Sequence, residues 1–384
     1  MSKKRKHTKK QLEDALRAYL NSQRRHVNRL YKNYLPELNK IFKDAEKQVE
    51  ELYKLYLEGR VSLNKVFYLT DYPEVEYRVK EIQKQLQKSL DSFFITSITK
   101  EWTNSNKAAD NLVKVVFPSI SKDKISKYYQ HNEKALNAFL NRNIASEGTR
   151  TISGRVWKLT NQYRRDIEDT LAIGIQQGDS AQVLAKRLNK YLNKPSQKYL
   201  DAETIADKKV RNEIQQRIEA KQGGQGVYNS AYKNARRLAA NETNLAYRNA
   251  ESERIEQLDF VVGYEIKVSN SHEAWLQKVW IPKHGSKPEI CDVLAGKYPK
   301  SFKWNSWHVS CKCFRITILK TIEELQEDNT RILRGEEVTT DSVNAVKEMP
   351  KAFRGWITDN TEKITNAKSK PIFWENNLSL IKSL

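Results

Sequence analysis

Cysteines and long apolar runs are the scarcest features of this chain. Three cysteines occur among 384 residues, so they cannot all pair with one another, and a chain of this length buries a substantial core without disulfides or metals. No segment approaches the roughly 18 uninterrupted apolar residues of a membrane-spanning helix. The basic start MSKKRKHTKK leads into an amphipathic pattern and not into the apolar core of a signal peptide. The sequence therefore predicts a soluble protein without a membrane span, made in the cytosol. The cytosol is a reducing compartment, so a structural disulfide is disfavoured.

Acidic residues are outnumbered, with 47 Asp and Glu against 68 Lys and Arg, which gives a net charge of +21. Such a surplus indicates a polyanionic partner, with nucleic acid first and an acidic protein surface second. The first 35 residues contain eleven Lys or Arg and two acidic residues, and such clusters can neutralise phosphates. A solvated basic tail over residues 1–10, with no specific partner, is the alternative. The candidate nucleic-acid-binding residues are Lys3, Lys4, Arg5, Lys6, Lys9, Lys10, Arg24 and Arg25.

Apolar residues recur at helical spacing through residues 11–147. The pattern predicts two helices within 11–59, divided or kinked at Pro36, and a third that begins near Pro73. These stripes favour a helical bundle or antiparallel hairpin, and ordinary core packing explains them better than a ligand groove does.

The helical pattern lapses between Gly148 and Gly154, which predicts a junction there. In the following IQQGDSAQVLAKRL, we expect Gly178 to end one helix in a left-handed conformation and Asp179 to cap the next, with Gln182 completing a capping box. Short helical hairpins of this kind more often serve packing than groove recognition.

The period of the pattern changes in the C-terminal part of the chain. A flexible turn at 221–226 precedes a long predicted helix from Tyr228. In the next segment, VVGYEIKVS, apolar residues alternate with others, as in a strand with one buried face. The sequence thus predicts an α+β, predominantly α-helical protein, in which a long-helix N-terminal region precedes a small α+β domain at 155–320 and a C-terminal helical extension at 321–384. The apolar residues of the predicted strand are Val262, Tyr264, Ile266 and Val268.

Four candidate metal ligands lie in EICDVLAGKYP and WHVSCKCFRITIL. The alternation in CKCFRITIL predicts a strand with Phe314, Ile316 and Ile318 on one face and the cysteines, Arg315 and Thr317 on the other. Three sulfurs and one imidazole suit tetrahedral zinc, and Lys312 and Arg315 would lower the pKa values of the thiols. The candidate ligands are Cys291, His308, Cys311 and Cys313.

Other interpretations of these residues remain open. The C-x-C spacing is tighter than that of a zinc knuckle, and free cysteines packed as small apolar residues are the favoured interpretation. A Cys–His nucleophilic pair would need an orienting acid and an oxyanion donor, which the sequence does not identify. Neighbouring Glu289 and Asp292 are expected to be ordinary exposed charges. The sequence therefore predicts either no cofactor or one structural zinc.

Four of the eight tryptophans surround the cysteines and are interleaved with lysines. Aromatic and cationic side chains in such a mixture can stack on bases or contact phosphates. Packing in a core or a subunit interface is the favoured alternative. The residues concerned are Trp275, Trp280, Trp304, Trp307, Lys278, Lys283, Lys287, Lys300 and Lys303.

The order of these motifs resembles that of phage head-morphogenesis proteins, the Mu F-like minor head (minor capsid) family. The matching elements are ANETN with Glu242 and Thr243, the strand FVVGYEIKVS, CDVLAGK with Cys291, Leu294, Gly296 and Lys297, and WHVSCKC with His308, Cys311 and Cys313. The resemblance covers residues 155–320 well, the last 64 weakly, and the first 150 only as a helical region.

The chain departs from the family pattern at four positions. Asn241 stands for an arginine, Val309 for a proline, Lys312 for an arginine, and Pro288 for a cysteine that would complete a C-x-x-C pair. The last change removes one potential metal ligand.

The resemblance implies a structural protein of the virion head, made in the host cytoplasm and located near the portal in few copies. It would associate with the portal protein, other head proteins and packaged double-stranded DNA during head assembly or DNA delivery. The alternatives are a metal-assisted nuclease or toxin-like enzyme, for which no spaced Asp/Glu/His constellation is evident, and a general basic nucleic-acid-binding protein.

Overall fold

The computed structural model describes residues 9–56, 65–143, 151–220, 227–309, 311–367 and 370–383. The chain is predominantly helical with one small antiparallel sheet, which confirms the predicted α+β class. It divides into two compact units. The sheet unit comprises Met1–Arg29, Ser97–Thr149 and Asn241–Leu384, and the helical unit comprises Leu30–Thr96 and Arg150–Ala240.

These units cut across the predicted segments 11–147 and 155–320. Two long helices, α3 (Pro73–Val116) and α9 (Ala231–Gln257), each contribute residues to both units. A continuous helix carries the same apolar period on both sides of such a boundary, so periodicity alone does not reveal it. The predicted junction falls partly at residues 144–150, and the predicted turn falls at 221–226; both stretches lie outside the described residues.

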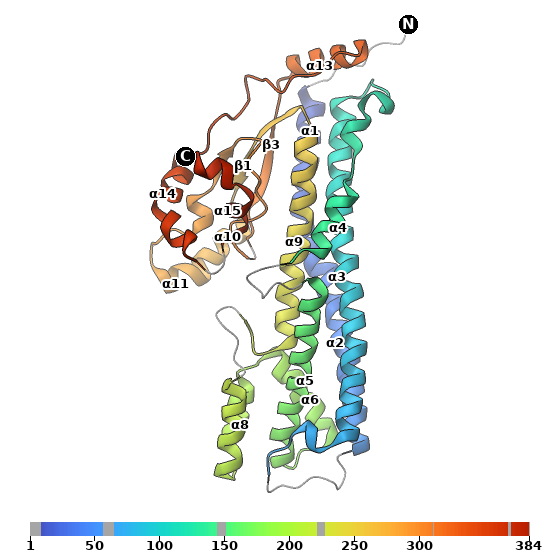
Figure 1. Ribbon diagram of the computed structural model, residues 1–384, viewed down its shortest axis with the longest axis vertical. Helices are drawn as coiled ribbons and strands as arrows, with labels where there is room; N and C mark the ends of the chain where they lie inside the picture. The colour runs from blue at the N-terminus through green and yellow to red at the C-terminus, as the bar shows by residue number, and fades with distance from the viewer. Residues whose placement is uncertain are drawn as a thin grey trace. The chain divides into compact units, whose positions relative to one another are not determined.

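The helical unit is built from helices (Figure 1), and their buried apolar side chains pack against one another. Phe42 and Tyr163 pack edge to face with ring centroids 5.7 Å apart, and α6 packs against both α2 and α5. With the first parts of α3 and α9, its elements are η1 (Leu30–Tyr34), α2 (Leu35–Tyr56), η2 (Leu69–Asp71), α5 (Ile152–Gln176), α6 (Ala181–Asn193), α7 (Gln197–Glu203) and α8 (Lys208–Ala220).

Pro36 and Pro73 lie where the helices change or begin, as predicted. Pro73 is the first residue of α3, as predicted. Just before Pro36, the π-helical turn η1 lies between α1 (Lys9–Arg29) and α2. Because proline lacks an N–H group, it cannot donate to the carbonyl four residues earlier, and the helical ladder changes at that point.

The α5–α6 turn confirms one predicted conformation and corrects another. Gly178 has a φ of 69°, the expected left-handed conformation. The predicted cap at Asp179 is wrong, because Ser180 caps α6 and accepts a hydrogen bond from the Val183 N–H. The Asp179 carboxylate instead pairs with Arg187 at 2.5 Å.

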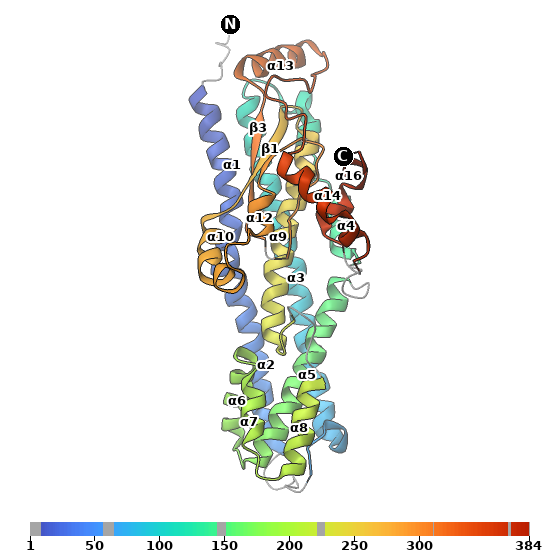
Figure 2. The same cartoon turned by 90° about the vertical axis from the view of Figure 1, so that its left-hand side faces the viewer.

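The sheet unit contains a three-stranded antiparallel sheet in the order β2-β1-β3, and Figure 2 shows β1 and β3 side by side. The strands are β1 (Val261–Lys267), β2 (Gly296–Tyr298) and β3 (Phe314–Leu319). Besides α1 and the second parts of α3 and α9, the helices are η3 (Lys122–Tyr129), α4 (Glu133–Asn141), α10 (Asn270–Trp275), η5 (Leu276–Trp280), α11 (Ile281–His284), α12 (Ile290–Val293), α13 (Ile322–Arg334), α14 (Lys351–Thr365), α15 (Ile372–Asn376) and α16 (Leu378–Lys382).

Strand β3 alternates as predicted, but its polar face is the buried one. Arg315 and Thr317 are buried, whereas Phe314, Ile316 and Ile318 are only partly covered. The Arg315 guanidinium lies 2.7 Å from a Glu251 carboxylate oxygen on α9, so its charge is neutralised inside the fold. The cysteines precede the strand instead of belonging to it.

The predicted C-terminal extension is helical, and it completes the core of the sheet unit. Phe353 of α14 packs against Tyr298 of β2 at 5.5 Å, and Phe373 of α15 packs against Trp307 at 5.0 Å between ring centroids. The described residues of this segment, 321–367 and 370–383, therefore fold together with the sheet and not as a separate appendage.

A buried ion network joins the helices of the helical unit. The Lys198 ammonium contacts Asp166 and lies 3.5 Å from Asp169, and all three side chains are at most 2% exposed. The Asp166 carboxylate also accepts the Ala231 N–H at 3.0 Å, and Asp169 lies 3.2 Å from Arg217. Removing one partner from such a network leaves a buried charge uncompensated.

We predict that Lys198→Met lowers the free energy of unfolding by about 3–5 kcal/mol, because it leaves Asp166 without its buried counter-ion. Lys54→Met is the matched control, since Lys54 forms an exposed pair with Glu50 and its loss should cost at most about 0.5 kcal/mol. Urea unfolding measures both. Equal losses in the two variants would contradict the assigned role of the network.

Candidate metal centre

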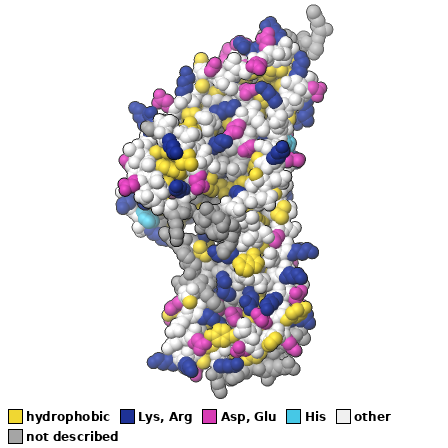
Figure 3. All heavy atoms as spheres, in the orientation of Figure 1, with side chains coloured by type: hydrophobic (Ala, Val, Ile, Leu, Met, Phe, Trp, Pro, Cys, Tyr) yellow, Lys and Arg dark blue, Asp and Glu magenta, His cyan; other side chains and the backbone are white. Residues whose placement is uncertain are grey.

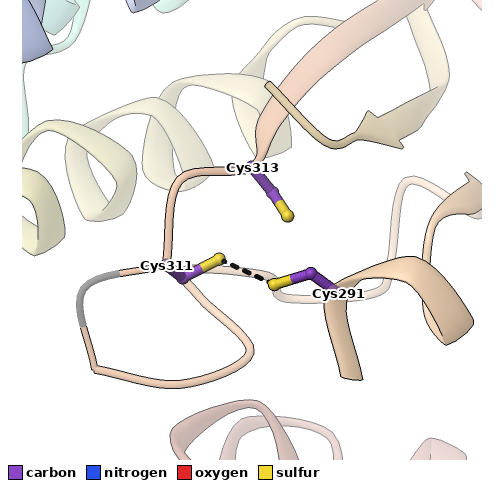
Figure 4. A group of neighbouring side chains, drawn as sticks. All are labelled: Cys291, Cys311 and Cys313. Carbon is purple, nitrogen blue, oxygen red and sulfur yellow. Dashed lines mark hydrogen bonds between the residues drawn. The ribbon is translucent and has the colours of Figure 1, made fainter. Parts of the chain in front are cut away.

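Three thiols from two segments of the chain meet in the core of the sheet unit. Cys291 lies on α12, and Cys311 and Cys313 lie in the segment that leads into β3. Figure 4 shows the three thiols directed toward one another. Their sulfur atoms lie within 4.8 Å of one another, and the residues are only 0–2% exposed. The three cysteines named as candidate ligands thus lie close together in the structure, and whether they bind a metal stays a prediction.

The sulfur geometry excludes a disulfide and fits a tetrahedral metal. The Cys291 and Cys311 sulfurs are 3.7 Å apart, whereas a disulfide bond is about 2.05 Å long. Two thiolates bound to zinc at about 2.3 Å in a tetrahedron would be separated by ~3.8 Å. The Cys291 and Cys311 thiols are therefore spaced as two ligands of one zinc ion would be.

The three thiols influence one another's ionisation. Burial opposes ionisation of Cys311, but hydrogen bonds from Cys291 and Cys313 and the charge of Arg248 lower the pKa of its thiol well below the usual range. Hydrogen bonds with Cys311 and Cys313, together with burial, raise the pKa of Cys291. Ionising all three thiols thus requires a further positive charge, which a divalent cation would supply.

His308, the fourth predicted ligand, also reaches the cluster. Its Nε2 lies 3.1 Å from the Cys291 sulfur, and its Nδ1 lies 2.8 Å from the carbonyl oxygen of Val309. A carbonyl only accepts, so Nδ1 carries the proton and, in the neutral ring, the lone pair of Nε2 faces Cys291. This is the tautomer that binds a metal through Nε2.

Glu289 and His272 belong to the same cluster, although the sequence did not point to them. The expectation that Glu289 is an exposed charge is wrong, because it is 5% exposed and its carboxylate accepts the Cys291 N–H at 2.7 Å. The other carboxylate oxygen lies 3.3 Å from His308 Nε2. His272 Nε2 lies 3.2 Å from Asp292. A carboxylate two residues before a cysteine, at the start of a helical turn, was the available signal.

Polar side chains of α9 hold the cysteine segment in place. The Arg248 guanidinium donates to the carbonyls of Asn305, Cys311 and Cys313, and Asn244 donates to the Cys311 carbonyl at 3.1 Å. The cation beside Cys311 is therefore Arg248, whereas Arg315, the predicted neighbour, pairs with Glu251.

Most of the other residues that carry the family resemblance lie inside the fold. Glu242 and Thr243 are buried on α9, where Glu242 pairs with Arg142 at 2.5 Å. Leu294 is part of the core. The remaining two, Gly296 and Lys297, begin β2, where Lys297 is exposed.

Gly296 is required by its backbone conformation and by its neighbour. Its φ of 152° is one that residues with a side chain rarely adopt, and an added Cβ would lie 2.9 Å from Pro350. The glycine of the CDVLAGK motif thus lets the start of β2 approach the chain before α14.

The structure describes four of the eight predicted nucleic-acid-binding residues. Lys3, Lys4, Arg5 and Lys6 lie outside the described residues, whereas Lys9, Lys10, Arg24 and Arg25 are exposed. The Arg24 guanidinium lies 5.0 Å from the ring centroid of Phe314 on β3. On the face seen in Figure 3, basic side chains are dispersed among acidic ones.

The four tryptophans near the cysteines divide into two pairs. Trp304 and Trp307 are buried in the core, as the packing interpretation predicted. Trp275 and Trp280 are half-buried on α10 and η5, with ring centroids 5.8 Å apart. Three exposed lysines flank this second pair, namely Lys278, Lys283 and Lys287.

Comparison of the chain with protein-family models, with curated proteins and with solved structures found no match. Among the described helices, none is both long enough and apolar enough to cross a membrane.

We predict that Arg248→Met exposes the cysteine segment in metal-free protein. Removing these charged hydrogen bonds costs about 1.5–3 kcal/mol, so Cys311 and Cys313 should react with a disulfide reagent about tenfold faster or more. Arg236→Met, which changes an exposed arginine of the same helix, is the control. Unchanged thiol reactivity in Arg248→Met would show that α9 does not hold the segment.

Proposed function

We propose that the protein is a structural minor head protein of a phage or prophage, in which the cysteine cluster binds structural zinc. In this role it associates with the portal protein, other head proteins and packaged DNA during head assembly or DNA delivery. Cys291, Cys311 and Cys313 supply three ligands, and His308 supplies the fourth.

The observation that carries this proposal is the convergence of separate motif elements in one compact unit. The CDVLAGK element contributes Cys291, and the WHVSCKC element contributes His308, Cys311 and Cys313, although the two are separated along the chain. The strand FVVGYEIKVS forms the centre of the sheet that lies beside them. Residues that share a motif order thus also share a site, which supports the resemblance to the head-morphogenesis family.

The chemistry of the four proposed ligands favours a structural ion over a catalytic one. Three thiolates and an imidazole fill a tetrahedral coordination sphere, whereas a catalytic zinc keeps a position open for water or substrate. A magnesium-dependent nuclease would moreover need oxygen ligands.

The charge of the chain supports contact with DNA that is independent of base sequence. The net charge of +21 and the dispersed basic side chains of Figure 3 suit many separate phosphate contacts. Such contacts release counterions, so binding weakens steeply as salt rises.

We predict that the purified protein contains zinc and does not cleave duplex DNA. Cys311→Ser should lose bound zinc and unfold at a lower temperature, because it removes a buried ligand. Ser286→Ala, an exposed change, should retain both properties. Metal analysis, thermal unfolding and a cleavage assay test these outcomes. Metal-dependent cleavage that disappears in Cys311→Ser would favour the nuclease alternative.

We predict that changing Lys9, Lys10, Arg24 and Arg25 together to Gln weakens binding to duplex DNA. For every phosphate that these side chains no longer neutralise, the slope of log K against log salt should become shallower by about 0.9. The matched control removes the same charge from exposed positions of the helical unit, namely Lys40, Lys43, Lys208 and Lys209. An equal change of slope in the two variants would show that the N-terminal helix has no special part in DNA binding.

Mass spectrometry of purified particles tests the head assignment separately. The protein should be recovered with portal-containing particles when it is expressed with the neighbouring head genes. A protein that neither binds duplex DNA at low salt nor enters such particles would contradict the proposed function.

A further inference from the structure

A second set of donor atoms adjoins the three thiols. A nitrogen of His272, a carboxylate oxygen of Glu289 and the sulfur of Cys291 lie within 4.8 Å of one another. These residues are 3%, 5% and 0% exposed. Cys291 also belongs to the first set, which consists of the three thiols and is called the thiol set below. His272 and Glu289 do not belong to it.

We propose that the cluster is a centre for two metal ions, bridged by the Cys291 thiolate. The first ion is the zinc proposed above, and this inference rests on that proposal. The second ion is bound by His272, Glu289 and Cys291. It is a divalent cation that accepts nitrogen, oxygen and sulfur ligands, and zinc is the natural choice.

The number of donors exceeds what a single ion can use. A zinc ion in a structural site takes four ligands. Seven donor side chains meet here: Cys291, Cys311, Cys313, His308, His272, Glu289 and Asp292. Once the thiol set and His308 bind one ion, His272 and the two carboxylates remain, and a thiolate sulfur has enough lone pairs to bind a second ion.

The surroundings of the Glu289 carboxylate also favour a bound cation. Its carboxylate contacts the Cys291 N–H and lies 3.3 Å from His308 and 3.8 Å from His272. Within the described parts of the chain, neither lysine nor arginine forms an ion pair with it. A buried carboxylate without a counter-ion is strongly destabilising. A cation bound to Glu289 would compensate this charge.

The ligands of the second site are held by local hydrogen bonds. Glu289 caps α12, and the Glu289 N–H donates to Asp292 at 3.3 Å, which completes a capping box. The Ser269 hydroxyl caps α10 by accepting the His272 N–H. Asp292 also lies 3.2 Å from His272 Nε2, so it links the two short helices that carry the ligands.

The departure from the family pattern lies next to this site. Pro288 occupies the position at which the resemblance expects a cysteine, and Glu289 follows it directly. Glu289 thus offers an oxygen ligand directly after the position at which the family pattern has a cysteine. It is directed toward His272 and His308, so it adds a new site instead of restoring the expected C-x-x-C pair.

The test is the metal content of the full chain after reconstitution with zinc under reducing, oxygen-free conditions. We expect about two zinc ions per chain, and about one in Glu289→Gln and in His272→Ala. Glutamine can still cap α12 through its carbonyl oxygen, so Glu289→Gln removes the charge and keeps the local fold. His284→Ala, which removes an exposed histidine of α11 that is not among the proposed ligands, should still bind about two.

Titration with cobalt(II) gives a second readout. The absorption of thiolate-bound cobalt should saturate near two equivalents in the unaltered chain and near one in Glu289→Gln. Circular dichroism of each variant establishes that it is folded. A single ion per chain in both the unaltered protein and Glu289→Gln would overturn the second site and leave the thiol site standing. No bound metal in any form would overturn both sites, while the DNA and particle experiments would still judge the head assignment.

Discussion

The buried ion pair between Arg315 of β3 and Glu251 of α9 is the contact on which the sheet unit depends. It directs the polar face of β3 inward, against a helix, and so determines how the preceding cysteine segment enters the core. Arg248 lies one helical turn before Glu251 and donates hydrogen bonds to the Cys311 and Cys313 carbonyls of that segment. The relative positions of Cys311 and Cys313 therefore follow from side chains of α9 that bind no metal.

This arrangement explains which parts of the site could be predicted. Period-two spacing correctly separated the two faces of β3, and the candidate ligands named from their donor types lie close together in the structure. The buried face could not be assigned, because the partner that neutralises Arg315 lies 64 residues away in the chain. Glu289 was missed because sequence alone does not distinguish an exposed carboxylate from one that caps a turn.

The fold class was predictable for a related reason. Helical stripes, Pro73 and Gly178 are local signals, and each acts within a few residues of its position. The grouping of segments into two units is not local. Helices α3 and α9 each belong to both units, and an amphipathic pattern does not record where its packing partner changes.

The smallness of the sheet gives the proposed metal centre a physical role. Strand β2 has three residues and pairs with β1 alone, and an isolated pair of strands is only marginally stable in water. The aromatic side chains of α14 and α15 cover it near Trp307. Metal bonds from Cys291 to Cys311 and Cys313 would join the turn before β2 to the segment before β3. Such bonds would cross-link two segments that no strand pairing connects directly, which is what a structural ion contributes to a small domain.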